Sequence, residues 1–301
     1  MVPAACARAN GGSRPNCCAN GICDRCPIDS KFTIINSLEK FLRPGVFLLA
    51  QTQARQVRHA NGVAEGLVVR NGTQDHLIRA DRIALGANAI FNAAILLRSR
   101  FAAPALGRYL HEQLAVVLQV DAPIRNFFGG TSITGLAYHF YHDHDRTDKA
   151  AVLIQNFNIP ADIRPEKDRW TERITLKLIA EDLPQEKNMV VLAGDEPLIE
   201  WHGHSDYGYA GLAHAADNID RIFPVEPERV RKVWVPTTEA HIQGTTRMGL
   251  DPETSVIDPG LRTHEVPNVL CLGAGAFPSC SPANPTLTLS ALSLRAGRQV
   301  A

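Results

Sequence analysis

The chain has 301 residues, of which 45% are hydrophobic and 21% charged, and its 31 basic residues balance its 31 acidic residues when histidine is neutral. A chain of this kind can bury the core of one large or two smaller domains, and its charge balance offers no basic field for nucleic acid or anionic lipid. No apolar run reaches the roughly 18 residues of a transmembrane helix. Residues 1–8 lack the features of a secretory signal, which favours a cytoplasmic location and leaves the periplasm open only through a partner subunit.

Four cysteines, Cys17, Cys18, Cys23 and Cys26, lie within one short, turn-rich segment near the N-terminus. Thiolates at this spacing are soft ligands that suit an iron–sulfur cluster or zinc. A disulfide or a set of free thiols is the alternative, although the adjacent Cys17 and Cys18 rarely pair with each other. The segment is therefore a candidate metal site.

The next stretch alternates predicted helices and strands. Residues 37–42 predict a helix and 46–50 a strand. The pair Asn71-Gly72, between two alternating runs, predicts a β-hairpin. A short strand over 81–85 then leads through Gly86 and Ala87 into a helix over 90–99. Such a strand–glycine–helix unit occurs where an α/β domain brings its backbone close to a cofactor, and a plain βα unit of the core is the alternative.

Residues 113–237 predict a second region that is rich in strands. Its mixed strands and long connections predict an antiparallel sheet, followed by a helix over 207–222. Just before this region, His111 is interpreted as a core or helix-edge histidine rather than a residue of a binding pocket.

The C-terminal residues 238–301 combine a histidine, a glycine turn and a helix start. His241 begins the segment H-I-Q-G-T-T-R-M-G, an apolar strand follows and ends in G-A-G-A, and A-N-P-T-L-T closes the block. Asn284 is a favoured helix N-cap and Pro285 fits the first helical position, so the sequence predicts a helix that starts at Asn284. The free N–H groups of that helix start favour an anionic group, and an ordinary capped surface helix is the alternative.

This block resembles the C-terminal signature of the glucose–methanol–choline (GMC) family of flavin oxidoreductases, in which a histidine of H-x-x-G-T-x-R-M-G and an asparagine or histidine of A-N-P-T-x-T face the flavin. The resemblance implies an α/β (α+β) fold with an incomplete FAD-binding Rossmann-like domain and an antiparallel substrate domain. We expect residues 1–112, with the cysteine segment, to form part of the FAD-binding domain and residues 113–237 to form the substrate-binding sheet domain. Residues 238–301 are expected to return to the FAD-binding domain and to carry the catalytic histidine and asparagine.

The same resemblance implies FAD-dependent oxidation of a CH–OH group in an alcohol, polyol or sugar. His241 is then the catalytic base and Asn284 its partner. The residues expected near FAD are Val57, Gly86, Ala87, Gly275, Ala276, Asn284, Pro285 and Thr286. Residues 273–276 lack the acidic residue that many members have there.

The cysteine segment, C-C-x4-C followed by x2-C-P, resembles the segment through which bacterial FAD-dependent glucose dehydrogenases bind a [3Fe-4S] cluster. The resemblance implies Cys17, Cys18 and Cys23 as ligands and Cys26 as a structural thiol. It also implies a dehydrogenase, with a small chaperone subunit and a cytochrome electron acceptor as partners. Thiols without metal are the alternative, since many relatives have no cluster.

A G-x-G-x-x-G turn between a strand and a helix, which such a FAD-binding domain requires, is missing at the start. Gly11 and Gly12 are followed by Ser13 and Arg14-Pro15, without a flanking strand or helix. We expect a fragment that lacks its N-terminal portion, or a portion carried by a separate polypeptide. The alternative function is a non-catalytic or truncated flavin or iron–sulfur electron-transfer subunit.

Overall fold

The computed structural model of the chain describes residues 2–3, 11–19, 23, 26–121, 132–141, 146–157, 173–223 and 226–300. The chain divides into two compact units that alternate along the sequence. Unit 1 comprises Met1–Leu48, Ala115–Ala180 and Ala210–Thr237, and unit 2 comprises Leu49–Leu114, Glu181–Tyr209 and Thr238–Ala301. These units differ from the expected division into 1–112, 113–237 and 238–301, because residues 1–48 group with the large sheet and residues 181–209 leave it.

The described part of unit 1 contains a six-stranded sheet in the order β1-β7-β8-β9-β6-β12. Its strands are β1 (Val2–Pro3), β6 (Leu114–Asp121), β7 (Ile133–Ala137), β8 (Val152–Phe157), β9 (Arg173–Ala180) and β12 (Val230–Trp234). The pairs β1–β7, β7–β8, β8–β9 and β6–β12 are antiparallel. This confirms the antiparallel sheet that the strand-rich sequence predicts.

Buried side chains hold this sheet together. Leu153 and Ile154 of β8 and Leu176 and Leu178 of β9 are at most 1% exposed, so the middle of the sheet is a continuous apolar core. Asp121, at the end of β6, accepts hydrogen bonds from Arg173 on β9 at 2.9 Å and from Arg231 on β12 at 2.6 Å. Its two partners compensate the cost of burying this carboxylate between the strands.

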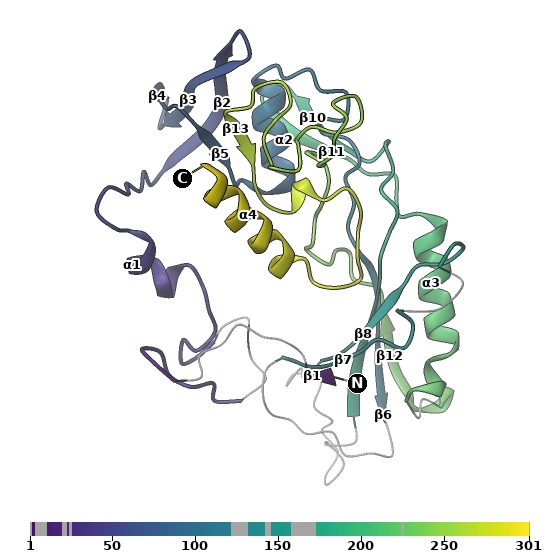
Figure 1. Cartoon of the computed structure of the whole chain (residues 1–301). Helices are drawn as coiled ribbons and strands as arrows, with labels where there is room; N and C mark the ends of the chain where they lie inside the picture. Colours follow the sequence, from purple (N-terminus) through teal and green to yellow (C-terminus); the bar gives the residue numbers. More distant parts are fainter. Residues whose placement is uncertain are drawn as a thin grey trace. The chain divides into compact units, whose positions relative to one another are not determined.

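Unit 2 contains three smaller sheets (Figure 1). The first joins β2 (Thr52–Ala60), β3 (Val63–Asn71) and β4 (Gln74–Arg79), and its β3–β4 pairing of Asn71 with Gln74 confirms the predicted hairpin. The second pairs β5 (Ile83–Leu85) in parallel with β13 (Val269–Cys271). The third is the antiparallel hairpin of β10 (Met189–Ala193) and β11 (Glu196–Glu200).

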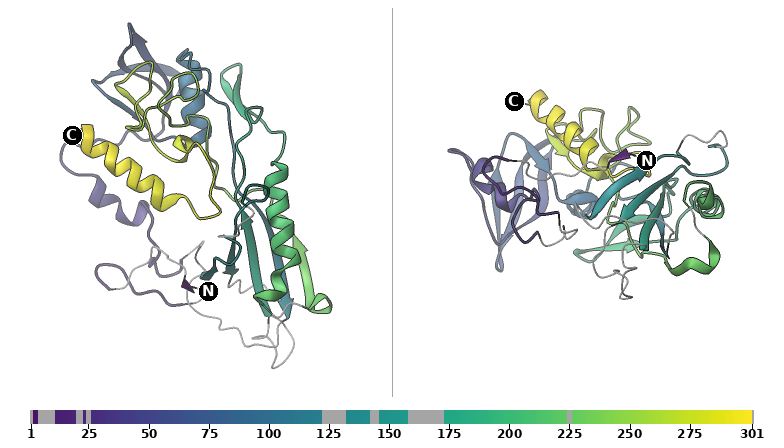
Figure 2. Two further views of the ribbon diagram at one scale, coloured as in Figure 1. Left: turned by 45° about the vertical axis from the view of Figure 1, so that its right-hand side comes forward. Right: turned by 90° about the horizontal axis from the view of Figure 1, so that it is seen from below.

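The helices follow the predicted positions with shifted ends. They are α1 (Leu38–Phe41), α2 (Asn88–Arg98), α3 (Asp206–Asp217) and α4 (Thr286–Val300), with 3₁₀ turns at Ile35–Ser37, Ile219–Arg221, Pro227–Arg229 and Ala274–Ala276. Figure 2 shows α4, in yellow, as one uninterrupted helix that runs to the C-terminal end. None of the described helices is long and apolar enough to span a membrane.

The strand predicted over 46–50 is wrong. Val46, Phe47, Leu48 and Leu49 lie in irregular backbone and are all more than half exposed, with Phe47 at 87%. An apolar run becomes a strand only when a neighbouring strand supplies hydrogen bonds, and among the described residues this segment pairs with none.

Candidate active site

A cavity of about 670 Å³ lies in unit 2, where the parallel strands β5 and β13 end. The backbone that follows β5 and the backbone that follows β13 both line it, together with the first turns of α2 and α4. Crevices at the carboxyl ends of parallel strands are the usual binding sites of α/β sheets. The lining residues are Gly86, Asn88, Ala89, Ile90, Thr238, Ala240, His241, Ile242, Leu272, Gly273, Ala274, Pro285, Thr286, Leu289 and Ser293.

The buried amide of Asn92, on α2, connects the two strand ends behind this cavity. Its Nδ2 donates to the carbonyl oxygens of Leu85 and Leu272, at 3.3 and 3.0 Å, and its Oδ1 accepts from the N–H of Ala87 at 2.8 Å. Asn92 is fully buried, so water does not compete for these bonds. The side chain therefore fixes the backbone that lines the cavity on both sides.

Two glycines in the wall of the cavity leave free space beside the backbone. A Cβ atom added to Gly86 or Gly273 would meet nothing within 4 Å, and Gly273 has a φ of +98°, a conformation that other residues rarely adopt. A bound molecule can thus approach the backbone closely at both positions. Gly86 is a predicted site residue, whereas Gly273 belongs to the same turn as the predicted Gly275 and Ala276.

Gly275 and Ala276 themselves lie behind this wall. A Cβ on Gly275 would come within 2.7 Å of Thr246 Oγ1 and 3.2 Å of the Gly244 carbonyl oxygen. The N–H groups of Thr246 and Met248 donate to the carbonyls of Gly275 and Ala276, at 3.2 and 2.9 Å. The structure therefore places these two residues against the 244–248 segment and outside the cavity lining.

His241 lies on the cavity wall, on a turn that a nearby strand segment holds. An isolated antiparallel bridge pairs His111 with Gln243, with N–H···O distances of 3.1 and 2.8 Å. This register sets Gln113 opposite His241, and His241 Nδ1 lies 2.7 Å from Gln113 Oε1. Gln113 Nε2 donates to the carbonyls of Ser281 and Ala283, at 2.5 and 2.8 Å.

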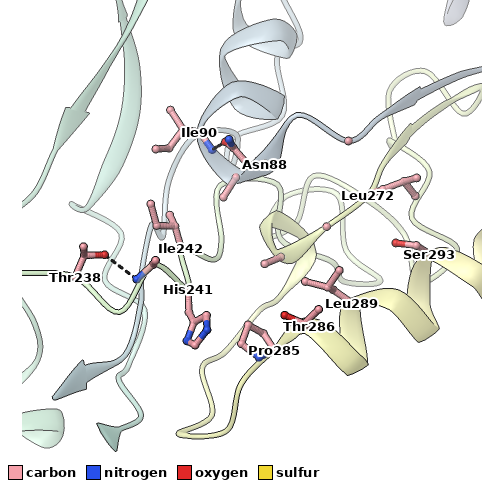
Figure 3. Close-up of a pocket in the computed structure, with 15 residues that line it drawn as sticks. Asn88, Ile90, Thr238, His241, Ile242, Leu272, Pro285, Thr286, Leu289 and Ser293 are labelled. Carbon is pink, nitrogen blue, oxygen red and sulfur yellow. Dashed lines mark hydrogen bonds between the residues drawn. The ribbon is translucent and has the colours of Figure 1, made fainter. Parts of the chain in front are cut away.

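The start of α4 faces the same imidazole. In Figure 3 the ring of His241 points toward Pro285 and Thr286. The helix begins at Thr286, and the N–H of Leu289 donates to the Pro285 carbonyl at 3.0 Å, so the helix starts later than the predicted Asn284. Asn284 is exposed and directly precedes this turn.

Two other predicted contacts lie outside the cavity lining. Val57, on β2, is 2% exposed and belongs to the apolar core of unit 2, and its N–H donates to Ser99 Oγ at 2.7 Å. Ala87 sits between Gly86 and α2, where its N–H is bound by Asn92. Of the predicted site residues, the structure thus brings Gly86, His241, Pro285 and Thr286 together around one cavity.

The predicted metal ligands are not brought together. Cys17 Sγ accepts from the N–H of Ala19 at 3.4 Å, whereas Cys23 Sγ accepts from the N–H of Ser132 at 3.2 Å. Within the described ranges of the chain, no group of three or more His, Cys, Asp or Glu side chains could hold a metal ion. Cys17, Cys18 and Cys23 thus form no such group among the described residues, and the cluster that they are expected to hold stays a prediction.

His111 is a core residue, as its interpretation from the sequence predicts. The side chain is 1% exposed, its Nδ1 donates to the Tyr109 carbonyl at 2.7 Å, and burial lowers its pKa below the usual 6.5. Because the folded state disfavours the imidazolium, the unfolded state takes up this proton first as the pH falls below about 6.5.

We therefore expect the free energy of unfolding to fall with pH below about 6.5, by up to roughly 1.4 kcal/mol per pH unit from this group. Urea unfolding at pH 7.5 and 5.5 measures the effect. His111→Asn keeps a donor for the Tyr109 carbonyl and cannot titrate, so its stability should depend less on pH. An equal pH dependence in both proteins would contradict the role of His111.

Both the sequence and the fold of this chain resemble those of known proteins. Residues 156–293 match the GMC oxidoreductase family model. The chain is 28% identical to a C-glycoside 3-oxidase of Arthrobacter globiformis, over 86% of this chain and 54% of the relative. It is 27% identical to a paromamine 6′-oxidase of Streptomyces fradiae, over 100% of this chain and 61% of the relative.

Among solved structures, a pyridoxine 4-oxidase from Mesorbium loti superimposes with a TM-score of 0.61 at 18% identity, over 82% of this chain and 57% of that chain. The chain thus spans little more than half the length of the proteins it matches. The match of residues 156–293 includes His241, Pro285 and Thr286 of the cavity wall. Residues 156–293 thus form a GMC oxidoreductase domain.

Proposed function

We propose that this chain is part of an FAD-dependent oxidoreductase that converts a CH–OH group of an alcohol, polyol or sugar to a carbonyl. The observation that supports the proposal most is the position of His241. Its imidazole lies on the wall of a cavity, is hydrogen-bonded through Nδ1 and is directed toward the first residues of α4. A histidine held in this way can remove a hydroxyl proton near neutral pH.

The cavity has the chemistry that a flavin ring requires. Apolar side chains of Ile90, Leu272 and Leu289 line it, as expected for a planar aromatic ring system. Gly86 and Gly273 leave room for the polar edge of a ligand to reach the backbone. At the start of α4, unpaired backbone N–H groups and the positive end of the helix dipole favour negative charge. Bound there, FAD would accept the hydride that leaves the substrate carbon.

The other steps belong to residues of this chain. We assign to His241 the removal of the proton from the substrate hydroxyl. Asn284 does not ionise, and its amide is assigned to donate a hydrogen bond to the oxygen as negative charge develops on it. Positioned bases typically contribute about 10²- to 10⁴-fold to such reactions.

The names of the relatives favour a polyhydroxylated substrate, since that of the A. globiformis protein specifies a glycoside.

No electron-transfer step is assigned to the cysteines, because the described ones do not form a metal-binding group. The chaperone subunit and the cytochrome acceptor stay predictions.

Anaerobic reduction of the flavin tests the proposal directly. The purified protein, supplied with FAD, is titrated without oxygen against a panel of aldoses, polyols and primary alcohols while the visible flavin absorbance is recorded. We expect at least one sugar or polyol to bleach the oxidised flavin bands. Protein that retains FAD but is reduced by none of these compounds would favour the non-catalytic alternative.

A further inference from the structure

We propose that Gln113 is a positioning residue that holds His241 in the tautomer with its proton on Nδ1 and so leaves Nε2 as the proton acceptor. The inference rests on the proposed role of His241 and extends it to a residue that touches neither substrate nor cofactor in the proposal. Gln113 is 1% exposed and is among the largest fully buried side chains of the described residues.

The backbone register places the two side chains face to face. His111 and Gln243 form an antiparallel bridge, so residues that lie two positions further along one segment oppose residues two positions earlier on the other. Gln113 and His241 are such a pair. Their side chains meet at 2.7 Å although they are 128 residues apart in the sequence.

The partners of Gln113 fix the orientation of its amide. The carbonyl oxygens of Ser281 and Ala283 can only accept hydrogen bonds, and both lie within 2.8 Å of Gln113 Nε2. The NH₂ group must therefore point to them, because it is the only donor of the side chain. The amide oxygen Oε1 is then the atom that faces His241.

The orientation of the amide in turn fixes the proton of His241. Since Oε1 can only accept, the imidazole must donate from Nδ1. In the neutral ring this leaves the lone pair on Nε2. When Nε2 takes a proton, Nδ1 keeps its own, so the bond to Gln113 persists in both protonation states and the ring need not turn during the reaction.

Gln113 also links the two segments that carry the proposed catalytic groups. Its oxygen binds the His241 turn, and its NH₂ group binds the carbonyls of the residues that precede Asn284. Buried polar networks in which every member is satisfied hold their geometry well, because water does not compete with them. One side chain therefore couples the orientation of the base to the position of the segment before α4.

The proton position can be measured without substrate or flavin. In protein with ¹⁵N-labelled histidine rings, the nitrogen shifts report which ring nitrogen carries the proton, and loss of one signal set in His241→Gln assigns this residue. We expect neutral His241 to be protonated on Nδ1 in the wild type and to populate both tautomers in Gln113→Leu. A wild-type His241 that carries its proton on Nε2 would overturn the proposal, whatever the variant does.

Kinetics separate this proposal from the proposed function. Gln113→Leu should lower kcat about tenfold, with little change in KM or flavin content, and should cause no further loss in a His241→Ala background. Equal losses in both backgrounds would refute the positioning role while the His241 assignment stands. A His241→Ala variant with normal turnover would refute the proposed function instead.

Gln119→Leu is the matched control. Gln119 is also buried, at 7% exposure, but lies further along β6 in unit 1, where it pairs with Lys232 of β12. The substitution removes a buried amide of the same size without touching the site. We expect it to leave both the His241 tautomer and kcat unchanged. An effect equal to that of Gln113→Leu would show that general loss of a buried amide, rather than positioning, explains the result.

Discussion

Replacing His241 by alanine should lower kcat at least about a hundredfold while FAD stays bound. The substitution removes the imidazole that accepts the substrate proton in the proposed reaction, and it leaves the backbone turn in place. The residual rate should come from proton transfer to water or hydroxide, so it should rise more steeply with pH than that of the wild type. Steady-state turnover with a saturating sugar or polyol, normalised to flavin absorbance, measures the effect.

His76→Ala is the control for this experiment. His76 lies exposed on β4, outside the cavity lining, and its loss should leave turnover unchanged. If His241→Ala kept normal turnover with a full complement of flavin, the base would have to be another group. If both variants lost activity equally, the effect would reflect general damage rather than chemistry at the cavity.

Local chemistry explains which elements could be predicted. The hairpin between β3 and β4 follows from Asn71-Gly72, because Gly72 readily adopts the positive φ that a tight turn needs, and it has a φ of +57°. The helices α2 and α4 follow from their apolar spacing. The apolar run at 46–50 has the composition of a strand, yet the sequence does not show whether a partner strand exists. The unit boundaries could not be predicted for the same reason, because the sequence does not show which segments contact each other. Residues 181–209 group with α2 only through tertiary contacts.

The sequence predicts the site residues that belong to a contiguous motif. It misses the residues whose roles depend on contacts with distant parts of the chain. His241, Pro285 and Thr286 belong to contiguous segments, and the structure brings them to one cavity. Gln113 meets His241 across 128 residues of sequence, and Asn92 joins the two strand ends only through its bond to Leu272, 180 residues away. A polar residue within an apolar helix or at the start of an apolar strand is a weak signal for such a role, because it says nothing of the partner.

The substitution with the largest expected effect on stability is at Gly244, where the turn that follows His241 comes close to the backbone of Tyr109. Gly244 has a φ of +85°, and a Cβ added there would lie 2.0 Å from the Tyr109 carbonyl oxygen and 2.9 Å from His111 Nδ1. Tyr109 has little freedom to move away, because Gly107 and Arg108 beside it are hydrogen-bonded to Thr245 at 2.8 and 3.0 Å. Gly244→Ala should therefore destabilise the fold by about 3 kcal/mol, from the left-handed conformation and the overlap together.

Gly72→Ala separates these two contributions. Gly72 also has a positive φ, +57°, but a Cβ there would meet nothing within 4 Å. Its replacement should cost only about 1 kcal/mol, the conformational penalty alone. Urea unfolding followed by far-UV circular dichroism compares the two variants. Equal losses would mean that the segments separate easily at Gly244. A larger loss at Gly244 would show that the turn bearing His241 is held rigidly against residues 109–111, which its proposed use as a positioned base requires.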